Sequence, residues 1–199
     1  MAETVYHRIT ITGDPGSGKS TFAAAVQAKT GYKLITTGNM FRALAAKKGV
    51  SVTELNEMAA TQGDIDKQVD DYIKSLNHEK DHLILDSRMA WHFIRHALKI
   101  RLTVDPDVAV RRIYNDKETK WRERFPDMET AMEDVRRRRE SEVWRYNELY
   151  GVDISDPANF DIVINTSHIT PDETLAQFED AFKKYLDYLE TPAIQAEAA

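Results

Sequence analysis

A short stretch near the amino terminus has the residue types and the spacing to bind a phosphate chain. Residues 9 to 21 read Ile-Thr-Ile-Thr-Gly-Asp-Pro-Gly-Ser-Gly-Lys-Ser-Thr. Glycines permit positive φ and a close approach of the backbone, so that successive N–H groups can point at phosphate oxygens. Lys19 would lie between the β- and γ-phosphates of a nucleoside triphosphate, and the Ser20 hydroxyl would bind Mg²⁺. The residues expected to bind ATP are Gly13, Asp14, Pro15, Gly16, Ser17, Gly18, Lys19, Ser20 and Thr21.

The residues on either side of this stretch agree with that prediction. Ile9 and Ile11 alternate with polar residues, as in a strand with one buried face. Residues 22 to 29 are a run of helix formers, and the positive N-terminal end of such a helix would face the anion. Strand, loop and helix together are typical of the phosphate-binding P-loop. The alternative is a glycine-rich turn that matches by chance.

Length and composition are those of one globular domain. The chain has 199 residues, 42% hydrophobic and 30% charged, with a net charge of −6 and no cysteine. Disulfides, thiolate metal sites and a cysteine nucleophile are therefore excluded. Residues 1 to 8 lack the apolar core that a signal peptide has, and no apolar run approaches the ~20 residues that a membrane span needs. We expect a cytoplasmic monomer whose partners are small nucleotides, and not a nucleic acid polymer or a membrane.

Strands that alternate with helices indicate an α/β fold with a doubly wound, five-stranded parallel sheet and helices on both faces. After the first strand, the expected strands are residues 32–36, 82–86, 100–104 and 161–165. A helical insertion over about residues 37 to 80 is expected between the second and third strands. It contains a helix through Lys48, a capping box at Ser51 to Glu54, and a helix with one apolar face. That face is formed by Ile65, Val69, Tyr72, Ile73 and Leu76.

The second half of the chain contains a long, charged excursion and a terminal helix. About residues 116 to 151 are expected to form a lid over the sheet. Thr170 to Glu173 predicts the capped start of the last helix. The single domain should cover residues 1–190, and residues 191–199 are expected to be a flexible tail.

Charged residues also follow the third expected strand. Asp86 ends that strand at the carboxyl edge, where open α/β sheets bind ligands, and it could orient Mg²⁺ or its waters. The alternative is a carboxylate that caps the next turn. Arg88 suits bidentate contact with a second phosphate group, and a surface ion pair is the alternative. Arg42 lies one turn into a helix that starts at a strand end, so it can reach the same cleft.

Residues 136 to 145, Arg-Arg-Arg-Arg-Glu-Ser-Glu-Val-Trp-Arg, have the most unusual composition in the chain. Helical spacing places Arg138, Glu142 and Arg145 on one face, and Arg136 nearly opposite. Such a face could close over a polyphosphate and neutralise the transferring phosphoryl group. The alternatives are a solvated helix of Arg–Glu pairs and an RNA-binding patch.

No general base stands out, and a phosphate acceptor needs none. A phosphate monoester has a second pKa of about 6 and is already anionic near neutral pH. Positioning and charge neutralisation would suffice for its phosphorylation.

The chain resembles the nucleoside monophosphate kinases, specifically the short, archaeal-type cytidylate kinases, over about residues 5 to 190. The resemblance rests on the P-loop and on four further segments: residues 37–42 (Thr-Gly-Asn-Met-Phe-Arg), 65–67 (Ile-Asp-Lys), 139–154 and 160–166. It implies that Arg42 and Arg88 hold the acceptor's phosphate, that Arg138 and Arg145 are lid arginines, and that residues 38 to about 76 hold the nucleoside.

Three positions depart from the pattern of that family. Asn39 stands where an acid is common, and Met89 stands where longer bacterial relatives have a ribose-binding aspartate. Asp116 replaces a second arginine that is expected four residues after Arg112, at the entrance of the lid. These departures concern base choice more than the reaction.

The expected site combines the P-loop with residues from three later segments. The catalytic residues are Lys19, Arg138 and Arg145, and Mg²⁺ is held by Ser20 and Asp86, by the latter directly or through water. The acceptor-binding residues are Thr37, Gly38, Arg42, Asp86, Arg88 and Glu142.

The expected reaction is reversible transfer of the γ-phosphoryl group of Mg·ATP to CMP or dCMP, which gives ADP and CDP or dCDP. The alternatives are another P-loop kinase, acting on AMP, UMP or dephospho-coenzyme A, and a nucleotide-regulated module that binds RNA or a protein.

Overall fold

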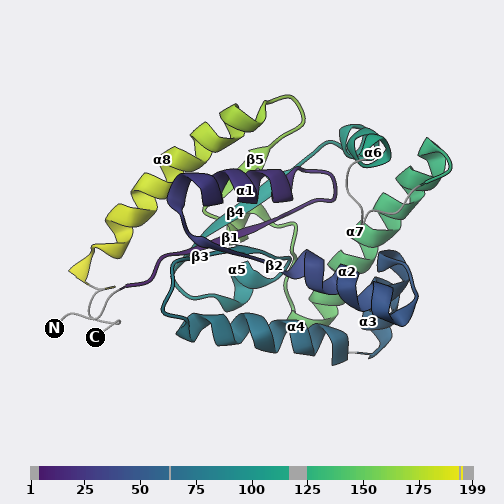
Figure 1. Cartoon of the computed structure of the whole chain (residues 1–199), viewed down its shortest axis with the longest axis horizontal. Coiled ribbons are helices and arrows are strands. Elements are labelled where there is room, and N and C mark those ends of the chain that lie inside the picture. Colours follow the sequence, from purple (N-terminus) through teal and green to yellow (C-terminus); the bar gives the residue numbers. More distant parts are fainter. Residues whose placement is uncertain (1–4, 63, 117–124, 193, 195–199) are drawn as a thin grey trace.

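A five-stranded parallel sheet forms the centre of the molecule (Figure 1). The computed structural model describes residues 5–62, 64–116, 125–192 and 194. The strands are β1 (Arg8–Gly13), β2 (Lys33–Thr36), β3 (Leu83–Asp86), β4 (Ala97–Thr103) and β5 (Ile162–Asn165). Their spatial order is β2-β3-β1-β4-β5, and every neighbouring pair is parallel. The predicted fold class is confirmed.

β4 is longer than the sequence predicted. It begins at Ala97 and not at Ile100, because the start of β1 needs a partner: Arg8 pairs with Ala97 and Thr10 with Lys99. The order of the strands places the ends of β1 and β3 side by side, with Ile11 opposite Asp86. Residues that follow these two strands therefore meet at one edge of the sheet.

Helices cover both faces of the sheet. On one face lie α1 (Lys19–Thr30) and α8 (Pro171–Leu189), which appear above the strands in Figure 1. Ile9, Ile11 and Ile100 of the sheet belong to the same apolar cluster as Phe22 of α1 and Phe178 of α8. On the other face lie α5 (Ala90–Phe93) and the end of α4 (Asp64–Ser75) with the 3-10 turn η1 (Leu76–His78).

The carboxyl-terminal helix begins at the predicted capping box, in which Thr170 accepts from the backbone of Glu173 and Glu173 accepts from that of Thr170. Within the expected tail, Ile194 is 7% exposed and belongs to the apolar cluster that also contains residues of α1 and α8. Residues 193 and 195–199 lie outside the described part of the chain.

The insertion between β2 and β3 contains α2 (Thr37–Lys48), α3 (Val52–Gln62) and α4. The predicted capping box is present, since Ser51 N–H donates to the Glu54 carboxylate (2.7 Å) and Glu54 N–H donates to the Ser51 hydroxyl (3.0 Å). The predicted apolar face of α4 is wrong at Tyr72, which is 39% exposed. The helix is rotated so that Asp66 and Asp70 face inward instead.

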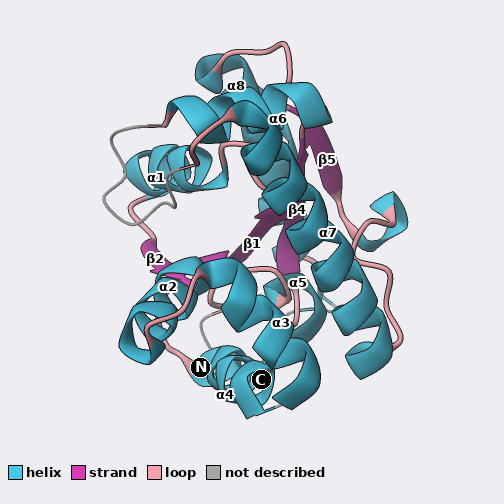
Figure 2. Ribbon diagram, turned by 90° about the vertical axis from the view of Figure 1, so that its right-hand side faces the viewer, coloured by secondary structure: helices cyan, strands magenta, loops and turns pink. Residues whose placement is uncertain are grey.

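The expected lid is dominated by one long helix. After α6 (Pro106–Asn115), residues 117–124 lie outside the described part of the chain, and α7 (Met128–Tyr150) follows. Asp127 begins α7 by accepting from the Thr130 N–H (2.8 Å). In Figure 2, α7 passes in front of the sheet, beside α3 and α6, and it contacts both of these helices. The 3-10 turn η2 (Pro157–Asn159) then leads into β5. Among the described residues, none of the helices has the length and apolar character needed to cross a bilayer.

Candidate active site

The loop after β1 has the backbone shape that its glycines predict. Gly13 has φ 142°, and a Cβ atom there would lie 1.9 Å from the carbonyl oxygen of Leu102 on the neighbouring strand. Gly16 has φ 74°, and a Cβ atom would lie 2.9 Å from Ala109 of α6. No side chain fits at either position without moving backbone. The loop therefore passes close to β4 and α6 before α1 begins at Lys19.

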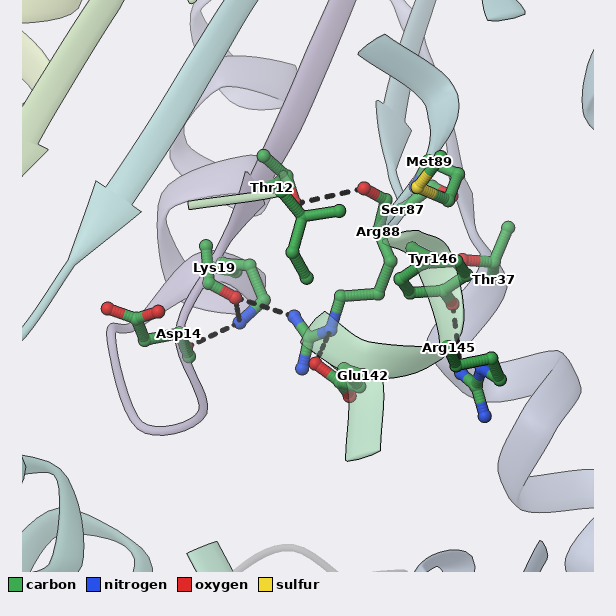
Figure 3. A network of polar contacts seen from close by, with 12 residues as sticks. Thr12, Asp14, Lys19, Thr37, Ser87, Arg88, Met89, Glu142, Arg145 and Tyr146 are labelled. Carbon is green, nitrogen blue, oxygen red and sulfur yellow. Dashed lines mark hydrogen bonds and ion pairs between the residues drawn. The ribbon is translucent and has the colours of Figure 1, made fainter. Parts of the chain in front are cut away.

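Lys19 is folded back onto the loop (Figure 3). Its Nζ donates to the carbonyl oxygens of Gly13 (2.9 Å) and Asp14 (2.7 Å). Burial, and next the charge of Arg88, lower the pKa of Lys19 to about 7. A polyphosphate would supply the negative charge that stabilises the ammonium, so the residues present fit the anion that the sequence predicts.

Arg88 and Lys19 donate to the same backbone atom, the carbonyl oxygen of Gly13. Nη1 of Arg88 donates to the Gly13 carbonyl oxygen (2.6 Å), and its Nε lies 2.8 Å from Oε2 of Glu142 on α7 (Figure 3). Burial alone would raise the pKa of Glu142, but the charges of Arg88 and of two arginines of α7 lower it below the usual value. Arg88 and Glu142 both line the cleft. Arg88 therefore does not form the surface ion pair that was the alternative prediction for it.

One cleft joins the loop to the helical insertion and to α7. Its walls come from the P-loop and α1, from α2, α3 and α4, from the end of β3, and from α6 and α7. The lining residues are Pro15, Gly16, Gly18, Lys19, Ser20, Thr37, Gly38, Phe41, Arg42, Val52, Asp66, Val69, Asp70, Ile73, Asp86, Ser87, Arg88, Met89, Ile113, Phe125, Arg138, Glu142 and Tyr146. All six residues expected to bind the acceptor are therefore in one cavity with Lys19.

Some of the residues predicted to bind ATP support the loop from behind and do not line the cleft. Ser17 is buried, and its hydroxyl has no hydrogen-bond partner among the described residues. Asp14 is buried against β4, and Thr21 is exposed on α1. Gly13 contributes its carbonyl oxygen, which accepts from both cations.

Ser20 and Asp86, the two side chains that the sequence assigns to Mg²⁺, come from different elements of the cleft. Ser20 is exposed in the first turn of α1, and Asp86 is half-buried at the end of β3. Both line the cleft. A hydroxyl and a carboxylate are ligands that Mg²⁺ accepts alongside phosphate oxygens and water. This donor set fits the predicted ion.

α2 presents its first turn to the cleft. The Thr37 hydroxyl donates to the Asp86 carbonyl oxygen (3.3 Å), which ties the start of α2 to the end of β3. Arg42 Nη2 donates to Asn39 Oδ1 (2.6 Å), and Asn39 Nδ2 donates to the Thr36 hydroxyl (2.7 Å). Asn39, one of the departures from the family pattern, thus holds the guanidinium of Arg42 by a neutral contact.

The arginines of α7 lie in different environments. Arg138 lines the cleft, its Nη1 lies 3.8 Å from Asp134 Oδ2, and its Nε is buried without a hydrogen-bond partner among the described residues. Arg136 points away and forms ion pairs with Glu133 (2.7 Å) and Glu140 (3.0 Å). The outer arginine is therefore paired with acids, as in a solvated helix, which does not favour an RNA-binding patch there.

Arg145, the third residue predicted to be catalytic, has a different environment from Lys19 and Arg138. It is 1% exposed and does not line the cleft. Its Nε lies 3.2 Å from Asp66 Oδ2, and its Nη2 donates to the Tyr146 hydroxyl (3.0 Å). Arg145 shares a helix face with Glu142 but lies a turn further along, where α7 packs against α4, and the buried acid of α4 binds it there.

Asp66 and Asp70 form a pair of acids on α4 that the sequence did not predict as a pair. Asp66 and Asp70 are both buried and line the cleft, and the Tyr150 hydroxyl donates to Asp70 Oδ2. Burial, followed by the charge of Asp66, raises the pKa of Asp70 to about 7. Acids four positions apart within an apolar stripe were the available signal, since such a pair must face the same side as the stripe.

Two further arginines support the P-loop: Arg112, which the sequence placed at the entrance of the lid, and Arg101, which the sequence did not single out. Arg112 of α6 donates to the carbonyl oxygens of Gly16 (3.3 Å) and Thr166 (2.7 Å). Arg101 of β4 is buried and forms an ion pair with Asp14. Met89 is 2% exposed and presents an apolar surface to the cleft.

The fold and the cleft define a P-loop protein with the architecture of small-molecule kinases. The structure is similar to that of shikimate kinase from Bacteroides thetaiotaomicron, with a TM-score of 0.60 over 89% of this chain and 98% of that chain at 15% identity. At that identity the likeness concerns the fold alone.

Sequence comparisons identify the family. The model of the cytidylate kinase-like family matches residues 8–168. The chain is 35% identical to a cytidylate kinase from Haloquadratum walsbyi over 179 residues, 89% of this chain and 90% of that protein. It is 36% identical to a cytidylate kinase from Natronomonas pharaonis over 180 residues, with the same coverage of both. The chain belongs to the cytidylate kinase-like family.

Proposed function

We propose that this protein transfers the γ-phosphoryl group of Mg·ATP to the phosphate of CMP or dCMP, reversibly, and yields ADP with CDP or dCDP. One observation carries the proposal: Lys19 from the donor side and Arg88 from the acceptor side both donate to the Gly13 carbonyl oxygen, at 2.9 and 2.6 Å. Two cations from different elements therefore converge on the point where the donor loop meets the acceptor side of the cleft.

The residues of the chain contribute positioning and charge. Backbone N–H groups of the P-loop and Lys19 bind the donor phosphates, and Arg42 and Arg88 bind the phosphate of the acceptor. Glu142 orients Arg88 through the 2.8 Å contact at Nε, and Nη1 donates to the Gly13 carbonyl oxygen, which leaves Nη2 for a ligand. Arg138 supplies a further cation to the charge that spreads over the transferring group.

Ser20 and Asp86 would hold Mg²⁺, which supplies neutralisation of charge on the donor phosphates when bound. The acceptor phosphate is the nucleophile and is already anionic, so no side chain of the cleft has to remove a proton. Closing of α7 over the cleft would exclude water, which otherwise competes as an acceptor.

CMP is favoured over other acceptors by the family to which the chain belongs. The relatives named above are cytidylate kinases, and they match this chain over most of its length. The apolar Phe41, Val52 and Met89, with the acids of α4, give the acceptor side of the cleft a surface for a base.

The test is ADP formation from ATP and Mg²⁺ with a panel of acceptors: CMP, dCMP, UMP, AMP and dephospho-coenzyme A. We expect rapid turnover with CMP or dCMP and none in the Lys19→Ala variant, whose folding is checked by circular dichroism. Faster turnover with another acceptor would move the base assignment and keep the mechanism. Acceptor-independent binding of RNA without any ADP formation would refute the proposed function.

A further inference from the structure

The P-loop carries an acid beside the site for a polyphosphate. Asp14 follows Gly13, and its carbonyl oxygen accepts from Lys19 Nζ (2.7 Å). Its side chain points away from the cleft into the protein, and the residue is 9% exposed. A carboxylate buried there is costly unless it is paired, and an unpaired one would repel the phosphates on the other side of the loop.

Arg101 pairs with this carboxylate from behind the loop. Ile100 and Leu102 face the core under α1, so Arg101 between them faces the opposite side of the sheet. Its Nη2 lies 3.1 Å from Asp14 Oδ1, and the residue is 5% exposed.

The same guanidinium also reaches the segment that follows α7. Nη1 of Arg101 donates to the Ile154 carbonyl oxygen (2.5 Å), and the guanidinium lies 5.6 Å from the centre of the Phe160 ring. The side chain of Arg101 thus joins the P-loop to the segment that follows α7, although Arg101 does not line the cleft.

We propose that Arg101 is a positioning residue for the P-loop, which cancels the charge of Asp14 and fixes the loop against the segment after α7. The inference rests on the ATP site of the proposed function and concerns affinity for ATP, not the choice of acceptor. Removing the guanidinium should weaken ATP binding because it leaves a buried anion next to the phosphates. Removing the anion as well should restore binding.

The experiment is a double-mutant cycle on the affinity for Mg·ATP, measured by calorimetry on the full chain without an acceptor. Arg101→Met should weaken binding about tenfold or more, since a buried charge loses its partner. The Asp14→Asn/Arg101→Met double variant should bind Mg·ATP within about threefold of the Asp14→Asn single variant, because neither keeps an unpaired carboxylate.

Arg8→Met is the matched control. Arg8 is equally buried, at 5% exposed, but it donates to the carbonyl oxygens of Asp81 and Glu79 at the opposite end of the sheet. Its loss should lower the melting temperature and leave the affinity for ATP unchanged. If Arg101→Met does not fold, Arg101→Gln takes its place, since it removes the charge and keeps a donor for Ile154.

A double variant that binds ATP as weakly as Arg101→Met would overturn the proposal, because the charge of Asp14 would then not be the cause. Equal loss of affinity in Arg8→Met would also overturn it and assign the effect to stability. Wild-type protein that binds ATP but phosphorylates no CMP would refute the proposed function and leave this test intact. Wild-type protein that binds no ATP would refute both.

Discussion

Binding of ATP should be accompanied by uptake of a proton at Lys19. In the free protein, burial and the charge of Arg88 lower the pKa of this ammonium to about 7. A bound polyphosphate would return the pKa to near or above its ordinary value of about 10.4. At pH 8, roughly a tenth of the free protein carries the charge and nearly all of the complex does, so about 0.9 proton is taken up per ATP.

The sign of the pH dependence follows from this uptake. Above pH 7 the free ammonium loses its proton, and binding must restore it from solution. The affinity for ATP should fall by up to about tenfold, or 1.36 kcal/mol, for each pH unit between about 7 and 10. The γ-phosphate contributes little in this range, because its own pKa is near 6.

The assay is calorimetric titration of Mg·ATP at pH 8 in two phosphate-free buffers of different ionisation enthalpy, which gives the number of protons taken up. Lys19→Arg is the matched control, since a guanidinium stays charged and its uptake should be close to zero. If the wild type takes up less than about 0.2 proton, or if Lys19→Arg takes up as much as the wild type, then Lys19 is not deprotonated in the free protein at pH 8 and the prediction is refuted.

Four further predictions concern residues of α7 and α4 and the N-cap of α8. Arg145→Ala should lower the free energy of unfolding by about 3–5 kcal/mol in urea titrations, because Asp66 stays buried without its cation. Arg138→Ala should mainly lower kcat. A pure rise in the KM for the acceptor would instead assign Arg138 to ground-state binding. Folding raises the pKa of Asp70 from 3.8 to about 7, so the wild type loses stability as pH rises between these values. The stability of Asp70→Asn relative to the wild type should therefore increase by about 2–3 kcal/mol from pH 5 to pH 7, and a constant difference would contradict the protonation. Thr170→Ala should cost about 1 kcal/mol by removing the cap of α8, which thermal unfolding would measure.

Local patterns in the sequence were sufficient for the elements and for the P-loop. Strand alternation, helix caps and the spacing of Gly13, Gly18 and Lys19 involve residues a few positions apart, and backbone geometry allows few structures for them. The same reasoning placed Thr37, Asp86 and Arg88 at one edge of a parallel sheet, and the structure brings them into one cleft. It failed at Tyr72, because the rotation of an amphipathic helix depends on what packs against it.

Only the tertiary structure decided which partners the buried charges have. The sequence placed Arg145 with Glu142 on one helix face but could not show that Asp66 of a distant helix binds it. Asp14 and Arg101 are 87 positions apart, and they meet because β1 and β4 pair in a register that neither strand specifies alone. Types and spacing of residues therefore predicted that this protein binds a nucleotide. Long-range packing determined which arginines line the cleft and which support the loop, since a buried charge must take its partner from the element that packs on it.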